Sequence, residues 1–280
     1  MLRRPLGNTG IEVSPLGLGT VKFGRNTAVD YPRPYEIPSD GCIADLLATA
    51  QHLGINLLDT APAYGTSETR IGEAIEGRRD HWVVCTKAGE TFDGTASHFD
   101  FADDAIMRSV EKSLVRLRTD TVDILLLHSD GRSVELIESA GAFRALSRLR
   151  REDIVRAVGF SGKSAADAEG AMSRCDVLMC TINASYRDEV GIARKAADLG
   201  AGVLVKKALA RGFQGDAETI AETACLDGVT SVVVGTINAN HLAANAAAIR
   251  RTCDPRTDLA PARGHPTRRV YPLDISRARS

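Results

Sequence analysis

Residues 57–65 read Leu-Leu-Asp-Thr-Ala-Pro-Ala-Tyr-Gly, an apolar run that ends on an acidic residue and enters a loop containing proline. Similar short runs rich in Val, Ile and Leu recur along the chain and alternate with longer stretches that show helical spacing. Several runs are apolar at consecutive positions, which is typical of parallel strands covered on both faces. The predicted strands are residues 16–19, 55–60, 82–87, 122–128, 155–160, 177–183, 202–206 and 231–235. Because strand and helix alternate about eight times, we predict an α/β fold that closes into a (β/α)8 TIM barrel.

The helices predicted between these strands include residues 39–53, 67–76, 103–117, 134–150 and 187–199. Ser39 and Ser67 stand at the start of two of these segments and are the expected N-caps. Before the first strand, residues 4–6 and 11–13 flank Gly7-Asn8-Thr9-Gly10, a turn whose residues tolerate positive φ. This pattern predicts an N-terminal β-hairpin that closes the bottom of the barrel.

Two segments fall outside the repeat. Residues 20–38 contain several prolines, and a loop of that length in a compact domain is often functional. We expect it above the C-terminal end of the first strand. Residues 252–280 are rich in proline and arginine and show no clear periodicity, so they are predicted to be an extended or poorly ordered tail. Residues 1–251 are therefore the predicted barrel domain.

The composition excludes several classes of protein. Hydrophobic residues at 44% and charged residues at 25% allow a sizeable core without metal or disulfides. Lys and Arg total 35 against 36 Asp and Glu, which gives no electrostatic reason to expect nucleic acid as a partner. No apolar stretch is long enough to span a bilayer and the first residues lack a signal-peptide pattern, so we expect a cytoplasmic protein with no membrane partner. The six cysteines include no C-x-x-C pair and are expected to be reduced thiols.

Four polar residues occur where successive predicted strands end. Asp59 ends the second strand, Tyr64 lies in the loop after it, Lys87 ends the third strand and His128 ends the fourth. Each has an ordinary structural alternative, because Asp59 could cap a turn, Tyr64 could be an interface ring, Lys87 a solvated strand end and His128 a core histidine. In a barrel, however, all four lie at the C-terminal mouth, where catalytic residues of this architecture collect.

The residue types suit proton transfer to a carbonyl group. A free tyrosine has a pKa of about 10, which is too high for an ideal acid near neutral pH, and a nearby ammonium lowers that pKa. We expect Lys87 to supply the ammonium, Asp59 to hold Lys87 by an ion pair, and His128 to orient the substrate carbonyl oxygen. Tyr64 is then expected to protonate that oxygen as hydride reaches the carbonyl carbon.

Three motifs carry a resemblance to a known family. Residues 6–20, Leu-Gly-Asn-Thr-Gly-Ile-Glu-Val-Ser-Pro-Leu-Gly-Leu-Gly-Thr, and residues 58–65, Leu-Asp-Thr-Ala-Pro-Ala-Tyr-Gly, resemble the start and the most characteristic motif of the aldo-keto reductase superfamily. Residues 123–128, Asp-Ile-Leu-Leu-Leu-His, are similar to its fourth strand, and the resemblance extends to about Ile249. It implies a catalytic tetrad at Asp59, Tyr64, Lys87 and His128, and reversible NAD(P)H-dependent reduction of aldehydes or ketones to alcohols. It also implies a small-molecule carbonyl substrate and a nicotinamide cofactor, with NADP(H) expected in preference to NAD(H).

The resemblance further places a cofactor site along the mouth. Ser161 matches a serine that contacts the carboxamide, while Asn183 stands where glutamine is usual. Gly235-Thr236 and His241 stand where many relatives place Lys-Ser and Arg to bind the 2′-phosphate. The loss of these two fixed cations weakens the argument for NADPH over NADH. The cofactor-binding residues that the resemblance implies are Gly19, Thr20, Asp59, Ser161, Asn183, Lys207, Ala208, Leu209, Gly235, Thr236, His241 and Asn245.

Other interpretations stay open. Residues 157–164, Ala-Val-Gly-Phe-Ser-Gly-Lys-Ser, nearly fit a phosphate-binding loop, so Gly162-Lys163-Ser164 would serve a nucleotide-phosphate enzyme. Lys206 or Lys207 could form a Schiff base with a carbonyl substrate. The chain could also resemble potassium-channel β subunits, which would make it a cofactor-binding regulatory subunit with weak reductase activity. His128 and Asp130 are a weak metal pair with no third ligand nearby, so we expect no metal.

The loops above the barrel are expected to select the substrate. These are residues 20–38, 88–102 and 129–133, and within them Phe23, Tyr31 and Phe92 are the predicted lining of an apolar pocket. The sequence fixes neither the physiological substrate nor the oligomeric state.

Overall fold

The computed structural model describes residues 1–253 and shows a closed barrel of eight parallel strands. The strands are β3 (Leu16–Gly19), β4 (Leu57–Asp59), β5 (Val83–Ala88), β8 (Val122–His128), β9 (Val155–Ser161), β10 (Val177–Thr181), β11 (Gly202–Lys206) and β12 (Ser231–Gly235). Each strand pairs with the next one in this order, and β12 closes the barrel against β3. The predicted (β/α)8 fold is confirmed, and the barrel strands consist almost entirely of buried residues, as their continuous apolar runs indicate.

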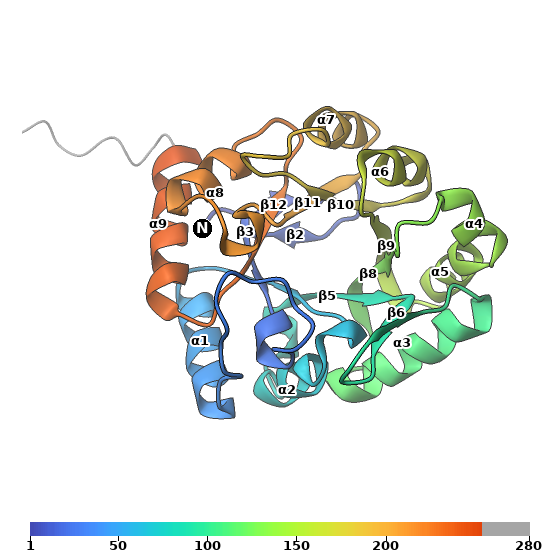
Figure 1. Cartoon of the computed structure of the whole chain (residues 1–280), viewed down its shortest axis with the longest axis horizontal. Coiled ribbons are helices and arrows are strands. Elements are labelled where there is room, and N and C mark those ends of the chain that lie inside the picture. The colour runs from blue at the N-terminus through green and yellow to red at the C-terminus, as the bar shows by residue number, and fades with distance from the viewer. Residues whose placement is uncertain (254–280) are drawn as a thin grey trace, which may run out of the picture.

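Helices surround the ring of strands on the outside (Figure 1). They are α1 (Asp40–His52), α2 (Ser67–Ala74), α3 (Asp103–Leu117), α4 (Val134–Ser139), α5 (Ala142–Arg151), α6 (Ala165–Ala171), α7 (Val190–Asp198), α8 (Ala217–Ala224) and α9 (Ala239–Cys253). Short 3-10 turns occur at η1 (Val21–Phe23), η2 (Pro62–Tyr64), η3 (Arg79–His81), η4 (Met172–Arg174) and η5 (Ala210–Gly212). Apolar faces of the helices and the outward faces of the strands form one large hydrophobic core around the barrel.

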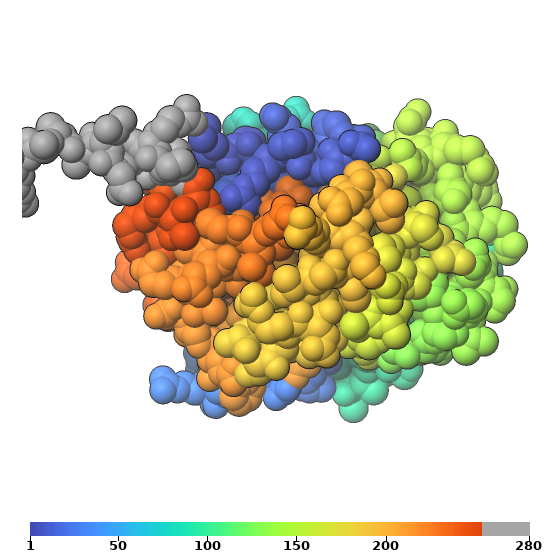
Figure 2. Space-filling model, turned by 90° about the horizontal axis from the view of Figure 1, so that it is seen from above, coloured from blue at the N-terminus to red at the C-terminus, as the bar shows by residue number. Residues whose placement is uncertain are grey.

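A short antiparallel hairpin, β1 (Arg4–Pro5) with β2 (Glu12–Val13), closes the bottom of the barrel as predicted. Leu6, Ile11 and Val13 are fully or almost fully buried in one cluster with inward-facing barrel residues such as Leu57 and Ile124. The blue N-terminal residues accordingly cap one end of the molecule in Figure 2. The opposite end of the barrel, where the strands terminate, is open and carries a cavity.

A second hairpin, β6 (Glu90–Phe92) with β7 (Ser97–Phe99), follows β5 and was not predicted. Its turn contains Asp93-Gly94, in which Gly94 has a φ of 101°. The Asp93 carboxylate accepts hydrogen bonds from the backbone N–H groups of Thr95 and Ala96. An Asp-Gly pair between short strands is a hairpin signal, so the sequence did contain the information.

Two local predictions about helices are wrong. The single helix expected over residues 134–150 is two helices, α4 and α5, because Gly141 has a φ of 103° that no helix accommodates. Ser67 is not an N-cap: Thr66 occupies that position without a side-chain bond, and the Ser67 hydroxyl donates to the carbonyl oxygen of Thr20 instead. The Ser39 prediction is confirmed, since its hydroxyl accepts a hydrogen bond from the N–H of Cys42.

The expectation of reduced cysteines is wrong for one pair. Cys225 and Cys253 form a disulfide that joins the C-terminal ends of α8 and α9. These helices pack against each other, so two cysteines that are 28 positions apart in the sequence become neighbours. The spacing of the cysteines along the chain does not reveal this contact. Thr252 and Cys253 belong to α9, and the rest of the predicted tail lies outside the described residues. Within residues 1–253 we find no helix long and apolar enough to cross a membrane.

Candidate active site

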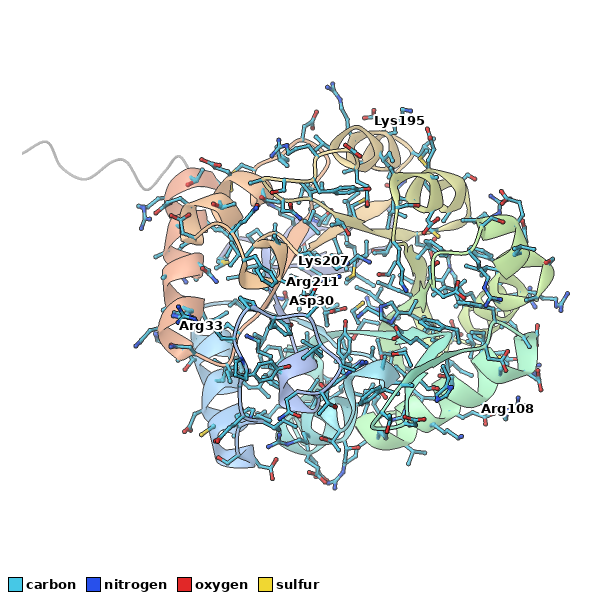
Figure 3. The ribbon with its side chains drawn as sticks, in the orientation of Figure 1. Asp30, Arg33, Arg108, Lys195, Lys207 and Arg211 are labelled. Atoms are coloured by element: carbon cyan, nitrogen blue, oxygen red, sulfur yellow. A yellow bond between two sulfur atoms is a disulfide. The ribbon has the colours of Figure 1, made fainter. Side chains whose placement is uncertain are left out.

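A cavity of about 510 Å³ opens at the C-terminal ends of the barrel strands. Its wall includes Asp59 at the end of β4, Tyr64 in the turn after it, His128 at the end of β8, and part of the loop of residues 20–38. Figure 3 shows Asp30, Lys207 and Arg211 over the centre of the ring of strands, whereas Arg108 and Lys195 lie on the outer helices. The structure therefore brings the predicted catalytic residues together at the mouth.

Lys87 and Asp59 form a buried ion pair beneath this cavity. Lys87 Nζ donates to Asp59 Oδ1 at 2.6 Å and to the Thr60 carbonyl oxygen at 2.8 Å. Their side chains are 1% and 6% exposed. Burial on its own would lower the pKa of Lys87, but the adjacent Asp59 carboxylate raises that pKa well above its usual value. Lys87 is therefore an ammonium group at neutral pH.

Tyr64 lies beside this ammonium group. Lys87 Nζ is 4.8 Å from the centroid of the Tyr64 ring. The sequence analysis predicted this proximity of a cation to the phenol. Burial raises the pKa of Tyr64 to about 12, and the opposing effect of Lys87 is smaller. The charge of Lys87 lowers the pKa of Tyr64, as predicted. The net shift is nevertheless upward, so the prediction of a lowered pKa for Tyr64 is wrong. Tyr64 is a protonated hydrogen-bond donor at neutral pH.

His128 contacts a residue that the sequence analysis did not single out. Its Nδ1 atom lies 2.7 Å from Oε2 of Glu90, the first residue of β6. The His128 ring meets the Tyr64 ring edge-on, with centroids 6.4 Å apart. Both Glu90 and His128 line the cavity, so a small substrate at Tyr64 also meets the Glu90–His128 pair.

The sequence of this chain matches the model of a known protein family. The model of the family described as "Aldo/keto reductase family" matches residues 15–227. This chain belongs to the aldo/keto reductase family. The match spans every barrel strand except β12 and includes all four predicted catalytic positions.

Several individual proteins are similar to this chain. An aldo-keto reductase structure from Pseudomonas aeruginosa is 46% identical, covers 90% of this chain and 95% of its own, and superposes with a TM-score of 0.82. L-galactose dehydrogenase of Arabidopsis thaliana is 36% identical over 165 residues, and the NADH-specific methylglyoxal reductase of Escherichia coli is 34% identical over 172 residues. These matches cover 57% of this chain and only about half of each relative, 48% and 51% respectively.

Most of the cofactor residues that the family resemblance implies lie on the cavity wall. The cavity is lined by Gly19, Thr20, Asp59, Ser161, Lys207, Ala208, Leu209 and Gly235. Asn183, Thr236, His241 and Asn245 do not line it. Asn183 donates to the Lys207 carbonyl oxygen at 3.3 Å, and the Thr236 hydroxyl accepts the Asn238 N–H before α9.

Of the three aromatic residues expected to line a substrate pocket, Tyr31 does so. Phe23 does not, because its side chain is fully buried in the hydrophobic core. Phe92 is also absent from the cavity wall and packs under the Arg25 guanidinium, whose carbon is 3.6 Å from the ring centroid. The lining of the pocket is consequently less aromatic than predicted.

Lysines give the cavity a positive character. Lys22, Lys163, Lys206 and Lys207 line it, and none of them lies within ion-pair distance of a carboxylate in residues 1–253. Of the three acidic residues of the wall, Asp59 is paired with Lys87 and Asp30 with Arg211, whereas Glu90 contacts His128, whose pKa is lowered by burial. This uncompensated positive charge suits an anionic ligand.

Lys206 is tied to the neighbouring strand. Its Nζ donates to Ser161 Oγ at 2.8 Å and to the Gly162 carbonyl oxygen at 2.6 Å. Burial, reinforced by the nearby charge of Lys207, lowers the pKa of Lys206 to about 7. A substantial fraction of Lys206 is therefore a neutral amine at neutral pH, while its hydrogen bonds hold it against β9.

The phosphate-loop interpretation of residues 157–164 does not fit the geometry. The Asp167 carboxylate accepts the Lys163 N–H at 2.9 Å, and the Ser164 hydroxyl caps α6 by accepting the Asp167 N–H. A carboxylate thus lies where that motif would need to hold a phosphate. Lys163 instead extends over the Phe99 ring, 5.1 Å from its centroid.

Proposed function

We propose that this aldo/keto reductase family member reduces aldehydes or ketones to alcohols, reversibly, with a nicotinamide coenzyme as the hydride carrier and Tyr64 as the general acid. The observation that carries the proposal is the Asp59–Lys87 ion pair with its ammonium 4.8 Å from the Tyr64 ring, next to an open cavity. A fixed ammonium stabilises negative charge that develops on the phenol oxygen as its proton leaves.

The cavity fits a dinucleotide coenzyme. It is lined both by Gly235 at β12 and by His128 at β8, and its unpaired lysines complement phosphate groups. Ser161 would hold the carboxamide, and Lys207 with the following Ala208 and Leu209 would face the pyrophosphate. NADP(H) in preference to NAD(H) remains our prediction, and the NADH-specific relative makes the comparison of both coenzymes informative.

Chain residues account for the steps at the substrate oxygen. A bound nicotinamide would supply or accept the hydride. Tyr64 donates its hydroxyl proton to the carbonyl oxygen, while Lys87 stabilises the resulting phenolate and Asp59 keeps Lys87 in place. His128, whose ring meets the Tyr64 ring edge-on, positions the same oxygen.

Substituting Tyr64 by Phe tests this assignment. We expect carbonyl reduction to fall by at least about 100-fold, the lower range for loss of a general acid, because the ring packing stays while the proton donor is lost. Coenzyme dissociation constants should stay close to those of the wild type. The matched control is Tyr35→Phe, whose hydroxyl only donates to the Arg25 carbonyl oxygen and which should keep full turnover. Wild-type turnover by Tyr64→Phe would refute the role of Tyr64.

A regulatory subunit with weak reductase activity stays the second candidate. It predicts tight coenzyme binding with turnover that stays slow for every carbonyl tested. The same coenzyme titrations and turnover measurements therefore separate the two candidates.

A further inference from the structure

Lys206 is a lysine of the cavity that the proposed reduction does not use. It ends β11, lines the cavity, and donates from Nζ to Ser161 Oγ and to the Gly162 carbonyl oxygen. In the part of the chain that the structure describes, no carboxylate lies within ion-pair distance of it. Lys87, by contrast, lies against Asp59 and is held as an ammonium group. Two lysines of the same barrel mouth therefore have opposite surroundings.

The hydrogen bonds of Lys206 fit a neutral amine. An ammonium group has three N–H donors and no acceptor, whereas a neutral amine has two N–H donors and a lone pair. Ser161 and Gly162 accept two N–H groups, and Nζ has no third hydrogen-bond partner among the described residues. Two acceptors thus satisfy both donors of the amine, and the protein does not use its lone pair.

The charged groups around Lys206 support this form. Burial, reinforced by the charge of Lys207, lowers the pKa of Lys206 to about 7. Glu189 opposes this shift, and Lys87 and Asp59 have smaller effects of opposite sign. About half of Lys206 is therefore a neutral amine at pH 7. A lysine that is removed from water next to another cation is the kind of lysine that attacks carbonyl groups.

Two further lysines near Lys206 carry positive charge. Lys207 follows it in the sequence, and the charge of Lys163 contributes to the lowered pKa of Lys207. Both side chains line the cavity, and neither forms an ion pair with a carboxylate of the described residues. A ligand that carries a carboxylate or phosphate group is attracted to these two charges.

We propose that Lys206 forms an imine with an aldehyde that carries a carboxylate or phosphate group, and that this adduct excludes the coenzyme from the mouth of the barrel. The lone pair of Nζ attacks the carbonyl carbon and gives a carbinolamine, which loses water as the C=N bond forms. One amine and one aldehyde give one imine and one water, with no oxidation or reduction. Nζ lies 2.8 Å from Ser161 Oγ, where the proposed function places the carboxamide, so the exclusion of the coenzyme rests on that function.

Borohydride trapping with pyridoxal 5′-phosphate is the first test, and it needs no coenzyme. Borohydride reduces an imine to a stable secondary amine, and mass spectrometry of the peptides locates the labelled lysine. We expect one pyridoxyl group per chain, on Lys206. Pyridoxal, which lacks the phosphate, should need an at least about tenfold higher concentration for half-labelling, because it is not attracted by Lys163 and Lys207.

A second pair of aldehydes distinguishes the two anionic groups. 4-Carboxybenzaldehyde carries a carboxylate where 4-methylbenzaldehyde carries a methyl group. The pair that shows the larger preference for its charged member identifies carboxylate or phosphate as the group that the lysines recognise.

A variant without the amine should lose the label. Lys206→Met keeps the length of the side chain and should abolish labelling at this position, and circular dichroism checks that the variant is folded. Lys195→Met is the matched control, because Lys195 lies on an outer helix and pairs with Glu169, and it should keep the label. Mapping of the label in the wild type tests the proposal without either variant.

The pH dependence of labelling separates Lys206 from ordinary lysines. The amine form of a group with a pKa of about 7 increases about tenfold from pH 6 to pH 8 and then levels off. The amine form of a fully solvated lysine, with a pKa of about 10.4, increases about 100-fold over the same range and continues to rise. We expect the first profile for the label on Lys206.

Labelling of other lysines with none on Lys206, or equal labelling by the charged and the neutral member of both pairs, would overturn the proposal. Saturating NADPH or NADH should suppress the label on Lys206. A label that forms there while a coenzyme is bound, as its fluorescence reports, would overturn the exclusion. If neither coenzyme binds, the proposed function fails, and the trapping experiment still decides whether Lys206 forms the imine.

Discussion

At the scale of single residues, the site depends on an ion pair removed from water. Lys87 and Asp59 are both almost fully buried, and each satisfies the charge of the other. Taking two charges out of water is costly, and leaving one of them alone is costlier still. The pair therefore serves to hold an ammonium group beside Tyr64 more than to stabilise the fold.

Breaking this pair from one side should show that cost. Lys87→Met leaves the Asp59 carboxylate buried without its cation, and we expect the free energy of unfolding to fall by about 3–5 kcal/mol. The double variant Lys87→Met/Asp59→Leu should lose less, since no uncompensated charge remains. Urea unfolding measures both. Lys195→Met is the control, because its partner Glu169 is exposed and such pairs contribute about 1 kcal/mol or less. A double variant less stable than Lys87→Met would contradict this account.

The sequence predicts which residues meet at the site better than it predicts their ionisation. Asp59, Tyr64 and His128 line one cavity because polar residues at the ends of parallel strands converge on one edge. The pKa of Tyr64 depends on burial, which no local pattern gives, and its net shift was predicted in the wrong direction. The prediction that Phe23 lines the pocket was wrong for the same reason, because an aromatic residue after a strand can face either a pocket or the core.

At the scale of elements, the strands were predicted closely because apolar runs of Val, Ile and Leu determine them. The bounds of β3, β8, β11 and β12 agree with the prediction to the residue. The predictions failed where contacts between residues distant in the sequence determine the structure. The β6–β7 hairpin carries few apolar residues and was assigned to a loop, and with it Glu90 was missed. Arg211 and Asp30, which pair across two loops of the mouth, had no signal in either loop alone.

The disulfide between α8 and α9 gives a prediction at this scale. A loop closed across 28 residues should contribute about 3–4 kcal/mol by restricting the unfolded chain. The double variant Cys225→Ser/Cys253→Ser, or the wild type under reductant, should lose that much free energy of unfolding. Cys42→Ser, which removes an exposed free thiol, is the control. If the double variant unfolds at the same urea concentration as the wild type, the disulfide does not stabilise the protein in solution.

In the whole molecule, the residues that close the barrel and the predicted catalytic residues lie at opposite ends. The hairpin β1–β2 seals the floor with Leu6, Ile11 and Val13, and the predicted catalytic residues gather at the mouth. The loop of residues 20–38 approaches the residues after β11 there, where Asp30 pairs with Arg211 and Tyr31 joins the cavity wall (Figure 3). A ligand held between these loops contacts both the unpaired lysines and Tyr64.

We expect the mouth of the barrel to bind a nicotinamide coenzyme and to pass its hydride to a carbonyl. The most direct measurement is a titration of the wild-type protein with NADPH and with NADH, followed by the fluorescence of the reduced coenzyme, and then turnover with a panel of aldehydes and ketones. We predict saturable binding of at least one coenzyme, tighter for NADPH, and one alcohol formed for each coenzyme oxidised. Failure of both coenzymes to bind, or binding without oxidation by any carbonyl on the panel, would contradict the account.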